Sequence, residues 1–121
     1  MAGKKTVVIG ASSNDERYSN MAVRKLKRYG HDVIAVGKRA GEIDGIPIHT
    51  DHPIVEDVNT VSLYVGPQNQ PPLYDYVLSL HPQRIIFNPG AENPDLEKMA
   101  EEKGIETLEA CTLVMLATNQ Y

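Results

Sequence analysis

The alternation of apolar and polar segments along the chain predicts five strands. Short apolar runs rich in β-branched residues recur at 4–9, 32–36, 60–65 and 84–87, with a weaker one at 105–108. Continuous apolar runs of this length are typical of strands that are buried on both faces of a parallel sheet. We therefore expect a mainly parallel sheet.

The segments between these strands carry apolar residues at helical spacing. Gly30 is placed to end the first helix, and Asn93 followed by Pro94 is a typical start for the third. The predicted helices are 20–29, 71–80, 94–103 and 112–119.

Strands that alternate with helices indicate βαβ units. The pattern predicts an α/β fold: a single Rossmann-like domain over residues 1–121, built as a three-layer sandwich with a five-stranded, mainly parallel sheet in the order 3-2-1-4-5. Glycine and proline interrupt segment 40–58 too often for a long helix. We expect a loop there, with one or two short extended pieces such as Ile46-Pro47-Ile48.

Composition narrows the class of protein further. The 121 residues carry a formal net charge of −4, which argues against a nucleic-acid surface or an anionic membrane as partner. No apolar run reaches the roughly 18 residues that a membrane span needs. A single cysteine, Cys111, excludes an internal disulfide. These features predict a cytosolic protein.

The first predicted strand runs into Gly10-Ala11-Ser12, where a ligand phosphate would approach in a fold of this kind. Glycine permits close approach of the backbone, and free N–H groups and a hydroxyl can donate to an anion. The dinucleotide fingerprint is incomplete, because Ser12 stands where its second glycine would be. An ordinary strand-to-helix turn remains the alternative.

The second predicted strand is followed by Gly37-Lys38-Arg39 instead of the carboxylate that usually accepts from the ribose of NAD. Two cations suit a phosphorylated ribose, either the 2′-phosphate of NADP or the 3′-phosphate of coenzyme A. A pair of solvated surface cations is the alternative. Five strands leave little room to hold a nicotinamide and its substrate, which favours coenzyme A.

The chain resembles the small CoA-binding proteins of Rossmann type and the N-terminal domain of the succinyl-CoA synthetase α subunit. The resemblance covers nearly the whole chain and rests on the order and spacing of several modest motifs. These are Val8–Ser12, Asn14–Ser19, Val36–Lys38, Gly41–Gly45, Tyr64–Pro67, Asn88–Asn93 and Glu109–Thr112.

The resemblance implies coenzyme A or an acyl-CoA as the ligand and a role for each matching position. The pyrophosphate would lie over Gly10–Ser12, and the ribose phosphate would meet Gly37 and Lys38. The adenine and ribose would lie along Tyr64–Pro67, and pantetheine along Asn88–Gly90. Arg17 would reach a phosphate. The implied residues are Gly10, Ala11 and Ser12; Gly37 and Lys38; Tyr64, Val65, Gly66 and Pro67; and Asn88, Pro89 and Gly90.

Two departures limit what the resemblance carries. Gly37 stands where many relatives have Asn followed by Pro, which leaves that turn less rigid. The second synthetase domain, with its phosphorylated histidine, is missing, so we do not expect the ligase reaction.

Residues for self-contained catalysis do not stand out in the sequence. There is no Ser-His-Asp spacing and no pair of carboxylates. We expect His49 and His52 to lie in a loop without metal, and Cys111 to be a small buried residue. A reactive thiol at a helix start is the alternative for Cys111.

The sequence therefore favours a CoA-binding carrier, sensor or regulatory module over an enzyme, with its protein partner left open. Two alternatives stand beside it. One is an NADP- or nucleotide-binding enzyme component that a partner completes, and the other is an interaction module with a vestigial cleft.

Overall fold

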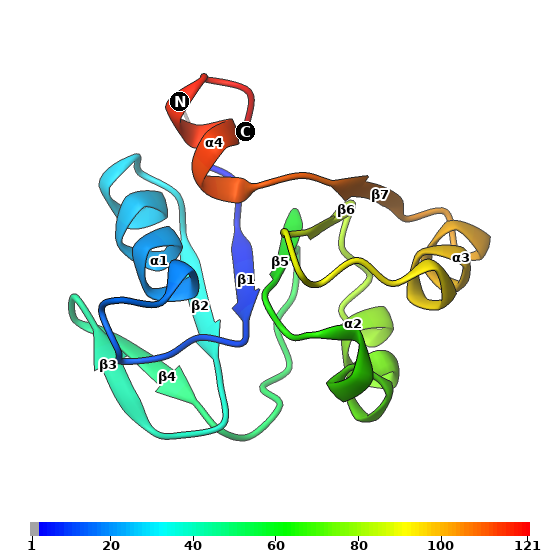
Figure 1. The fold of residues 1–121 in the computed structure, drawn as a ribbon, viewed down its shortest axis with the longest axis horizontal. Coiled ribbons are helices and arrows are strands. Elements are labelled where there is room, and N and C mark those ends of the chain that lie inside the picture. The colour runs from blue at the N-terminus through cyan, green and yellow to red at the C-terminus, as the bar shows by residue number, and fades with distance from the viewer. Residues whose placement is uncertain (1–2) are drawn as a thin grey trace.

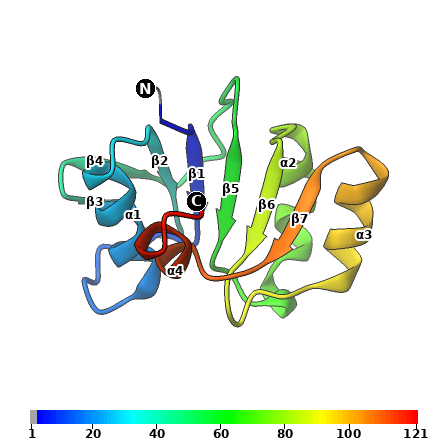
Figure 2. The same ribbon diagram turned by 90° about the horizontal axis from the view of Figure 1, so that it is seen from above.

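One twisted sheet lies between two layers of helices in the computed structural model, which describes residues 3–121 (Figure 1, Figure 2). Met1 and Ala2, which the single-domain prediction included, lie outside the described residues. The strands are β1 Thr6–Ile9, β2 Val33–Val36, β3 Gly41–Ile43, β4 Ile46–His49, β5 Thr60–Leu63, β6 Arg84–Phe87 and β7 Glu106–Glu109. The helices are α1 Tyr18–Arg28, α2 Tyr74–Ser79, α3 Pro94–Glu102 and α4 Thr112–Ala117, with short 3-10 turns η1 Pro67–Asn69 and η2 Pro71–Leu73.

The strand order is β3-β4-β2-β1-β5-β6-β7. Every neighbouring pair is parallel except β3 and β4, which form an antiparallel hairpin at one edge. Val7 of β1 lies beside Ile34 of β2 and Val61 of β5. The parallel strands therefore all present their carboxyl ends at the same edge of the sheet, which we call the carboxyl edge.

The three-layer α/β prediction is confirmed, but the five-stranded sheet in the order 3-2-1-4-5 is wrong in both number and order. The predicted third strand, 60–65, contains β5 and pairs with β1, on the side away from β2. The place beside β2 belongs to β4, which arises from the segment predicted as a loop. If β4 is counted as the third parallel strand, the strands on this side of the sheet follow the Rossmann-like order 3-2-1.

The missed hairpin has a local cause. Asp44 and Gly45 connect β3 to β4 with φ values of 51° and 84°, and two consecutive positive values are what a tight two-residue hairpin turn requires. The extended piece Ile46-Pro47-Ile48 is real and lies within β4. Pro47 can be accommodated because it faces only the three-residue edge strand β3, opposite Glu42.

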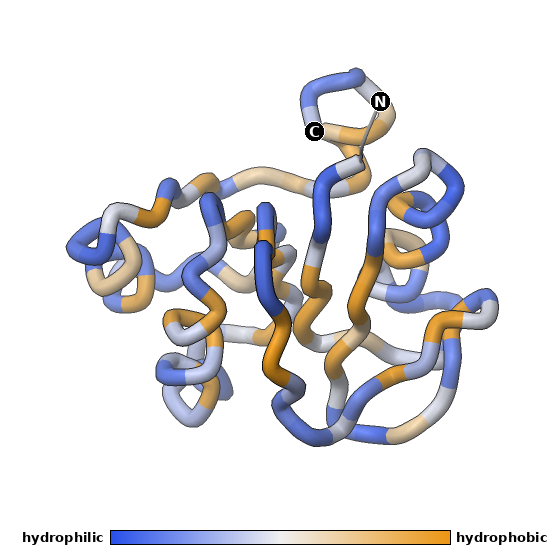
Figure 3. The backbone as a smooth tube through the Cα atoms, turned by 180° about the vertical axis from the view of Figure 1, so that it is seen from behind, coloured by the Kyte–Doolittle hydropathy of each residue, from blue (hydrophilic) through white to orange (hydrophobic). Residues whose placement is uncertain are grey.

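A separate apolar core fills each side of the sheet. Val7, Ile9 and Phe87 point toward α2 and α3, whereas Val8 and Ala35 point toward α1 and α4. Because successive residues of one strand enter opposite cores, the central strands read as continuous apolar runs. Figure 3 shows this as hydrophobic segments in the interior and hydrophilic ones at the outer turns.

The predicted helix boundaries agree with the structure to within a few residues. Gly30 follows α1 with a φ of 87°, and its N–H donates to the Lys27 carbonyl at 3.0 Å. The Asn93 side chain caps α3 by accepting from the N–H groups of Asp95 and Leu96. No helix within residues 3–121 has the length and apolar character to cross a membrane.

Candidate functional site

The predicted site segments meet at the carboxyl edge. The N–H groups of Gly10 and Ala11 both donate to the Val36 carbonyl at 2.9 Å, joining the turn after β1 to the end of β2. The Tyr64 N–H donates to the Ile9 carbonyl at 2.9 Å, which places the segment after β5 on the other side of the same turn. The segment after β6 follows, since the Asn88 N–H donates to the Leu63 carbonyl at 3.3 Å.

Two glycines allow the turns at this edge to pack closely. Gly10 has a φ of 95°, and a Cβ there would lie only 3.1–3.2 Å from atoms of Tyr64 and Val65. A Cβ on Gly37 would lie 2.2 Å from the Ala11 carbonyl oxygen. The turn that carries Lys38 is therefore pressed against the first turn.

The loop from Ala11 to Arg17 presents free backbone donors. Across residues 3–121, the N–H groups of Ser12 and Ser13 donate to no other protein group. The Ser12 hydroxyl instead accepts from the Asn14 N–H at 3.1 Å. The buried Asn20 side chain of α1 donates to the Ser12 carbonyl at 2.9 Å, and so holds the loop against the helix. Two adjacent free donors ahead of a helix suit an anion.

Exposed cations flank this loop. Arg17 lies at the start of α1 without making a side-chain cap, and Lys38 follows Gly37 on the neighbouring turn. In the part of the chain that the structure describes, the ion pair within 4.0 Å joins Lys27 and Asp44, so Arg17 and Lys38 make none.

Three carboxylates lie at the far half of the carboxyl edge. Glu92 follows β6, Glu109 ends β7, and Glu97 lies on α3 beside them. Burial and then the neighbouring Glu109 raise the pKa of Glu97 above its ordinary value. The residues next to β1 and β2 thus include Arg17 and Lys38 together with Asp15 and Glu16 of the same loop, whereas Glu92, Glu97 and Glu109 next to β6 and β7 are all acidic.

The Tyr64 side chain turns away from the edge and packs against the core beneath α1 and α4. Its buried hydroxyl has no hydrogen-bond partner within residues 3–121, and burial raises the pKa of Tyr64 well above its ordinary value. The backbone of Tyr64–Pro67, rather than the phenol, borders the edge. Buried Gln70 fixes this segment by donating to the Val65 and Ala91 carbonyls at 2.8 and 2.7 Å.

Asn88 is fully buried and its side chain is committed to the fold. Its Nδ2 donates to the Ser62 hydroxyl and the Leu63 carbonyl, both at 3.0 Å, and its Oδ1 accepts from the Thr112 N–H at 2.8 Å. Asn88 thereby ties β6 to β5 and to the start of α4. Pro89 and Gly90 are exposed, and the Gly90 N–H donates to the Glu92 carboxylate at 2.8 Å.

The remaining candidates for chemistry are dispersed. Cys111 is half-buried at the start of α4, and His49 ends β4. His52 stacks on the Tyr76 ring with centroids 4.5 Å apart, which is a packing contact. Among residues 3–121 no three His, Cys, Asp or Glu side chains are grouped as a metal site would require.

Several buried polar residues that organise the edge were missed from the sequence. Asn93 donates to Gln70 at 2.9 Å and to the Tyr74 hydroxyl at 2.8 Å, while Ser62 hydrogen-bonds to Thr112 at 2.8 Å. The sequence predicts Asn93 as a helix cap or a pantetheine contact, not as a link between segments. The partners of these residues lie 19 to 50 positions away, so local pattern gives no signal for them.

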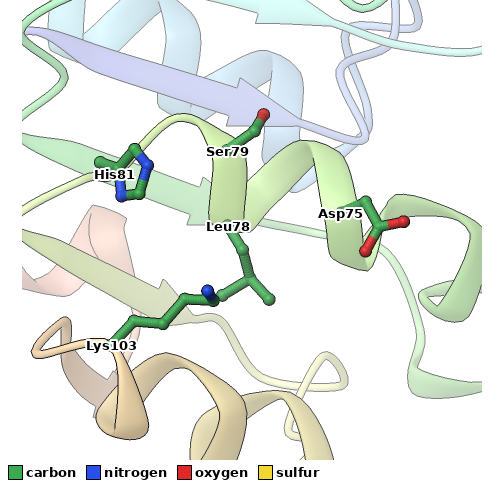
Figure 4. A pocket seen from close by; sticks show the side chains of 5 residues that line it. All are labelled: Asp75, Leu78, Ser79, His81 and Lys103. Carbon is green, nitrogen blue, oxygen red and sulfur yellow. The ribbon is translucent and has the colours of Figure 1, made fainter.

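A hollow of about 240 Å³ lies elsewhere, between α2 and the end of α3 (Figure 4). None of the predicted site residues lines it. Its lining residues are Asp75, Leu78, Ser79, His81 and Lys103.

Comparison with known proteins places the chain in a family. The model of the CoA binding domain matches residues 4–117. A crystal structure of a protein described as uncharacterized is 47% identical, covers 100% of both chains and has a TM-score of 0.97. The structure of cell-free ID.343 from Thermus thermophilus is 23% identical over 98% of this chain and 91% of its own, with a TM-score of 0.85.

A larger enzyme shares the fold. The dinucleotide-forming acetyl-coenzyme A synthetase 1 of Ca. Korarchaeum cryptofilum, in complex with phosphate and ADP, is 17% identical. The match covers 89% of this chain and 26% of the synthetase, with a TM-score of 0.69. No curated protein matches the chain. By the match over residues 4–117, this chain belongs to the family of CoA-binding domains.

Proposed function

We propose that this protein binds coenzyme A or an acyl-CoA at the carboxyl edge and acts as a carrier, sensor or regulatory module. The observation that carries the proposal is the contact between two turns. The free N–H groups of Ser12 and Ser13 lie in the loop that packs against the turn bearing Lys38. The backbone N–H groups could therefore bind the pyrophosphate of a nucleotide while Lys38 binds the phosphate on its ribose.

The ligand would extend along the edge from the turns after β1 and β2 to the segment after β6. Its pyrophosphate would lie over Gly10-Ala11-Ser12, within reach of Arg17, and its ribose phosphate would meet Lys38. The adenine and ribose would border the backbone of Tyr64–Pro67, and pantetheine would pass Pro89 and Gly90. Bound CoA supplies a thiol that carries an acyl group as a thioester.

The surroundings of the distal end support a non-catalytic role. The side chains of Asn88, Ser62 and Thr112 are engaged with one another and with the backbone. A general base must lie within hydrogen-bond reach of the group it activates. Across the described residues, Cys111 makes no hydrogen bond through its thiol to a histidine or a carboxylate.

An NADP-binding component completed by a partner is the second candidate. Lys38 favours it as well, because a 2′-phosphate and a 3′-phosphate present the same charge to an exposed ammonium group. Binding measured with both ligands separates the two proposals.

The test compares CoA with 3′-dephospho-CoA on wild-type protein and on Lys38→Ala. We expect wild-type protein to prefer CoA and Lys38→Ala to lose that preference, since only CoA carries the 3′-phosphate. A charge-assisted hydrogen bond contributes about 1.5–3 kcal/mol, or about 10- to 150-fold in affinity. Lys103→Ala, at the end of α3, is the matched control and should bind as wild type. Equal losses for both ligands in Lys38→Ala would contradict the role of Lys38.

A further inference from the structure

A groove of about 370 Å³ lies between α1 and α4, where the two helices run side by side (Figure 2). On α1 the lining positions are separated by three, four and seven residues, so they form one continuous stripe on the outer face of the helix. The opposite face of α1, with Val23 and Leu26, is buried in the core. The groove is lined by Met21, Arg24, Lys25, Arg28 and Leu113.

Among residues 3–121, the three cations of the groove form no ion pair with a carboxylate within 4.0 Å. Arg24 donates through Nε to the Asn20 side chain at 2.8 Å, and the Lys25 ammonium lies 5.9 Å from the centre of the Tyr29 ring. The ion pair within residues 3–121 uses Lys27, which is not a lining residue. Cations in the last turn suit the helix dipole, but Arg24 and Arg28 are like charges four residues apart and repel each other.

The α4 side of the groove is apolar. The helix reads Thr-Leu-Val-Met-Leu-Ala and carries no charge. Leu116 is buried in the core, whereas Val114 is 56% exposed and Leu113 is half-buried in the groove. The α1 side of the groove is therefore mainly cationic, and the α4 side is apolar.

The positive charge of the groove and the negative charge of the whole protein argue against several kinds of binding partner. A two-fold contact with a second copy would place the same three cations against each other. A net charge of −4 opposes binding of the whole protein to an anionic membrane or nucleic acid. A concave surface also receives protruding side chains better than it receives a flat bilayer.

We infer that the α1–α4 groove binds an acidic segment of a partner protein, with apolar side chains of that segment against Met21 and Leu113. Carboxylates on either side of those apolar residues would pair with Arg24, Lys25 and Arg28. This arrangement is the helix-in-groove mode of peptide recognition with a defined charge. The inference does not depend on CoA binding, because the groove residues are not among those assigned to the ligand.

The experiment uses a labelled synthetic peptide of about 14 residues, four helical turns, made of glutamate with leucine at every third or fourth position. Its control replaces each glutamate with lysine. Fluorescence anisotropy with the full chain should show saturable binding of the acidic peptide only, weakened by salt. The double variant Lys25→Glu/Arg28→Glu should weaken binding by about tenfold or more, as reversed charges at an interface do. Leu113→Ala, at the half-buried lining position of α4, should also weaken it.

Matched variants separate a defined groove from general charge attraction. Lys98→Glu/Lys103→Glu makes the same charge change on α3 and should leave the affinity within about twofold, since isolated surface charges contribute little. In a methyl spectrum, Met21 and Leu113 should shift first on titration.

Three results would overturn the inference. The first is equal binding of the acidic and basic peptides. The second is an equal loss of affinity in the α1 and α3 double variants. The third is binding of the protein to phosphatidylserine vesicles without binding of the acidic peptide, which would assign the surface to lipid.

Discussion

The contact between the first turn and the turn after β2 predicts a large effect of Gly37→Ala. A Cβ at this position would lie 2.2 Å from the Ala11 carbonyl oxygen and 3.1 Å from Cγ2 of Ile48. The local backbone cannot easily yield. The Gly37 N–H donates to the His49 carbonyl at 2.9 Å, and the preceding Val36 carbonyl accepts from both Gly10 and Ala11. Relieving the clash must therefore disturb the turn that we assign to the pyrophosphate.

The expected magnitude follows from the packing. Overpacking of this kind typically costs 1–3 kcal/mol, and a contact this short places Gly37→Ala at the upper end, about 2–3 kcal/mol. An unfolding entropy of about 2.1 cal/mol/K per residue gives about 0.25 kcal/mol/K for 121 residues. The melting temperature should fall by about 8–12 °C.

Thermal unfolding by calorimetry measures this change, with Gly66→Ala as the control. Gly66 has a φ of −62°, which alanine adopts freely, and its Cβ would meet only the flexible end of Gln68. Gly66→Ala should shift the melting temperature by no more than about 2 °C, the scale of an ordinary surface substitution. A similarly small shift for Gly37→Ala would refute the close contact between the turns, and so would an equal loss in the control.

Two further predictions concern stability. Asn93→Ala removes the cap of α3 and leaves the buried Gln70 Oε1 without its donor, so urea unfolding should show a loss of about 2–3 kcal/mol. Asn93→Asp keeps the cap acceptor but places a carboxylate oxygen against Gln70 Oε1, so it should be destabilised as well. An alanine variant as stable as wild type would contradict this network. The Lys4 N–H donates to Nδ1 of His31 at 2.9 Å, and burial, then Lys4 and Arg84, lower the pKa of His31 below its ordinary 6.5. Below that pH the unfolded chain binds more protons at His31 than the folded chain, so the free energy of unfolding should fall on acidification through this range. His31→Asn should flatten the decline, and an unchanged pH profile in this variant would count against it.

The sequence was most informative for individual elements. All five predicted strands and all four helices are present. Central strands such as β1 and β5 are buried on both faces and so read as continuous apolar runs, and burial of one face of a helix spaces its apolar residues at helical intervals. The predicted order failed at a single place. Asp44-Gly45 is a strong local hairpin signal, but it lies within a polar, proline-containing segment and its short strands bury only Ile43 and Ile48.

For the candidate site, the sequence indicated the segments but not the use of each side chain. Residues that follow parallel strands necessarily gather at one edge, so Gly10, Gly37 and Asn88 could be grouped before the structure. Whether a side chain faces the edge depends on distant partners. The amide of Asn88 bonds to Ser62 and Thr112, and Tyr64 turns into the core.

The central claim is that the carboxyl edge binds a CoA nucleotide. The most direct measurement is calorimetric titration of purified protein, freed of any co-purified ligand, with CoA, 3′-dephospho-CoA, NADP and NAD. We expect binding of CoA at about micromolar affinity, roughly −8 kcal/mol, with weaker binding of 3′-dephospho-CoA and of both dinucleotides. Tighter binding of NADP than CoA, or no binding of any of the four, would contradict it.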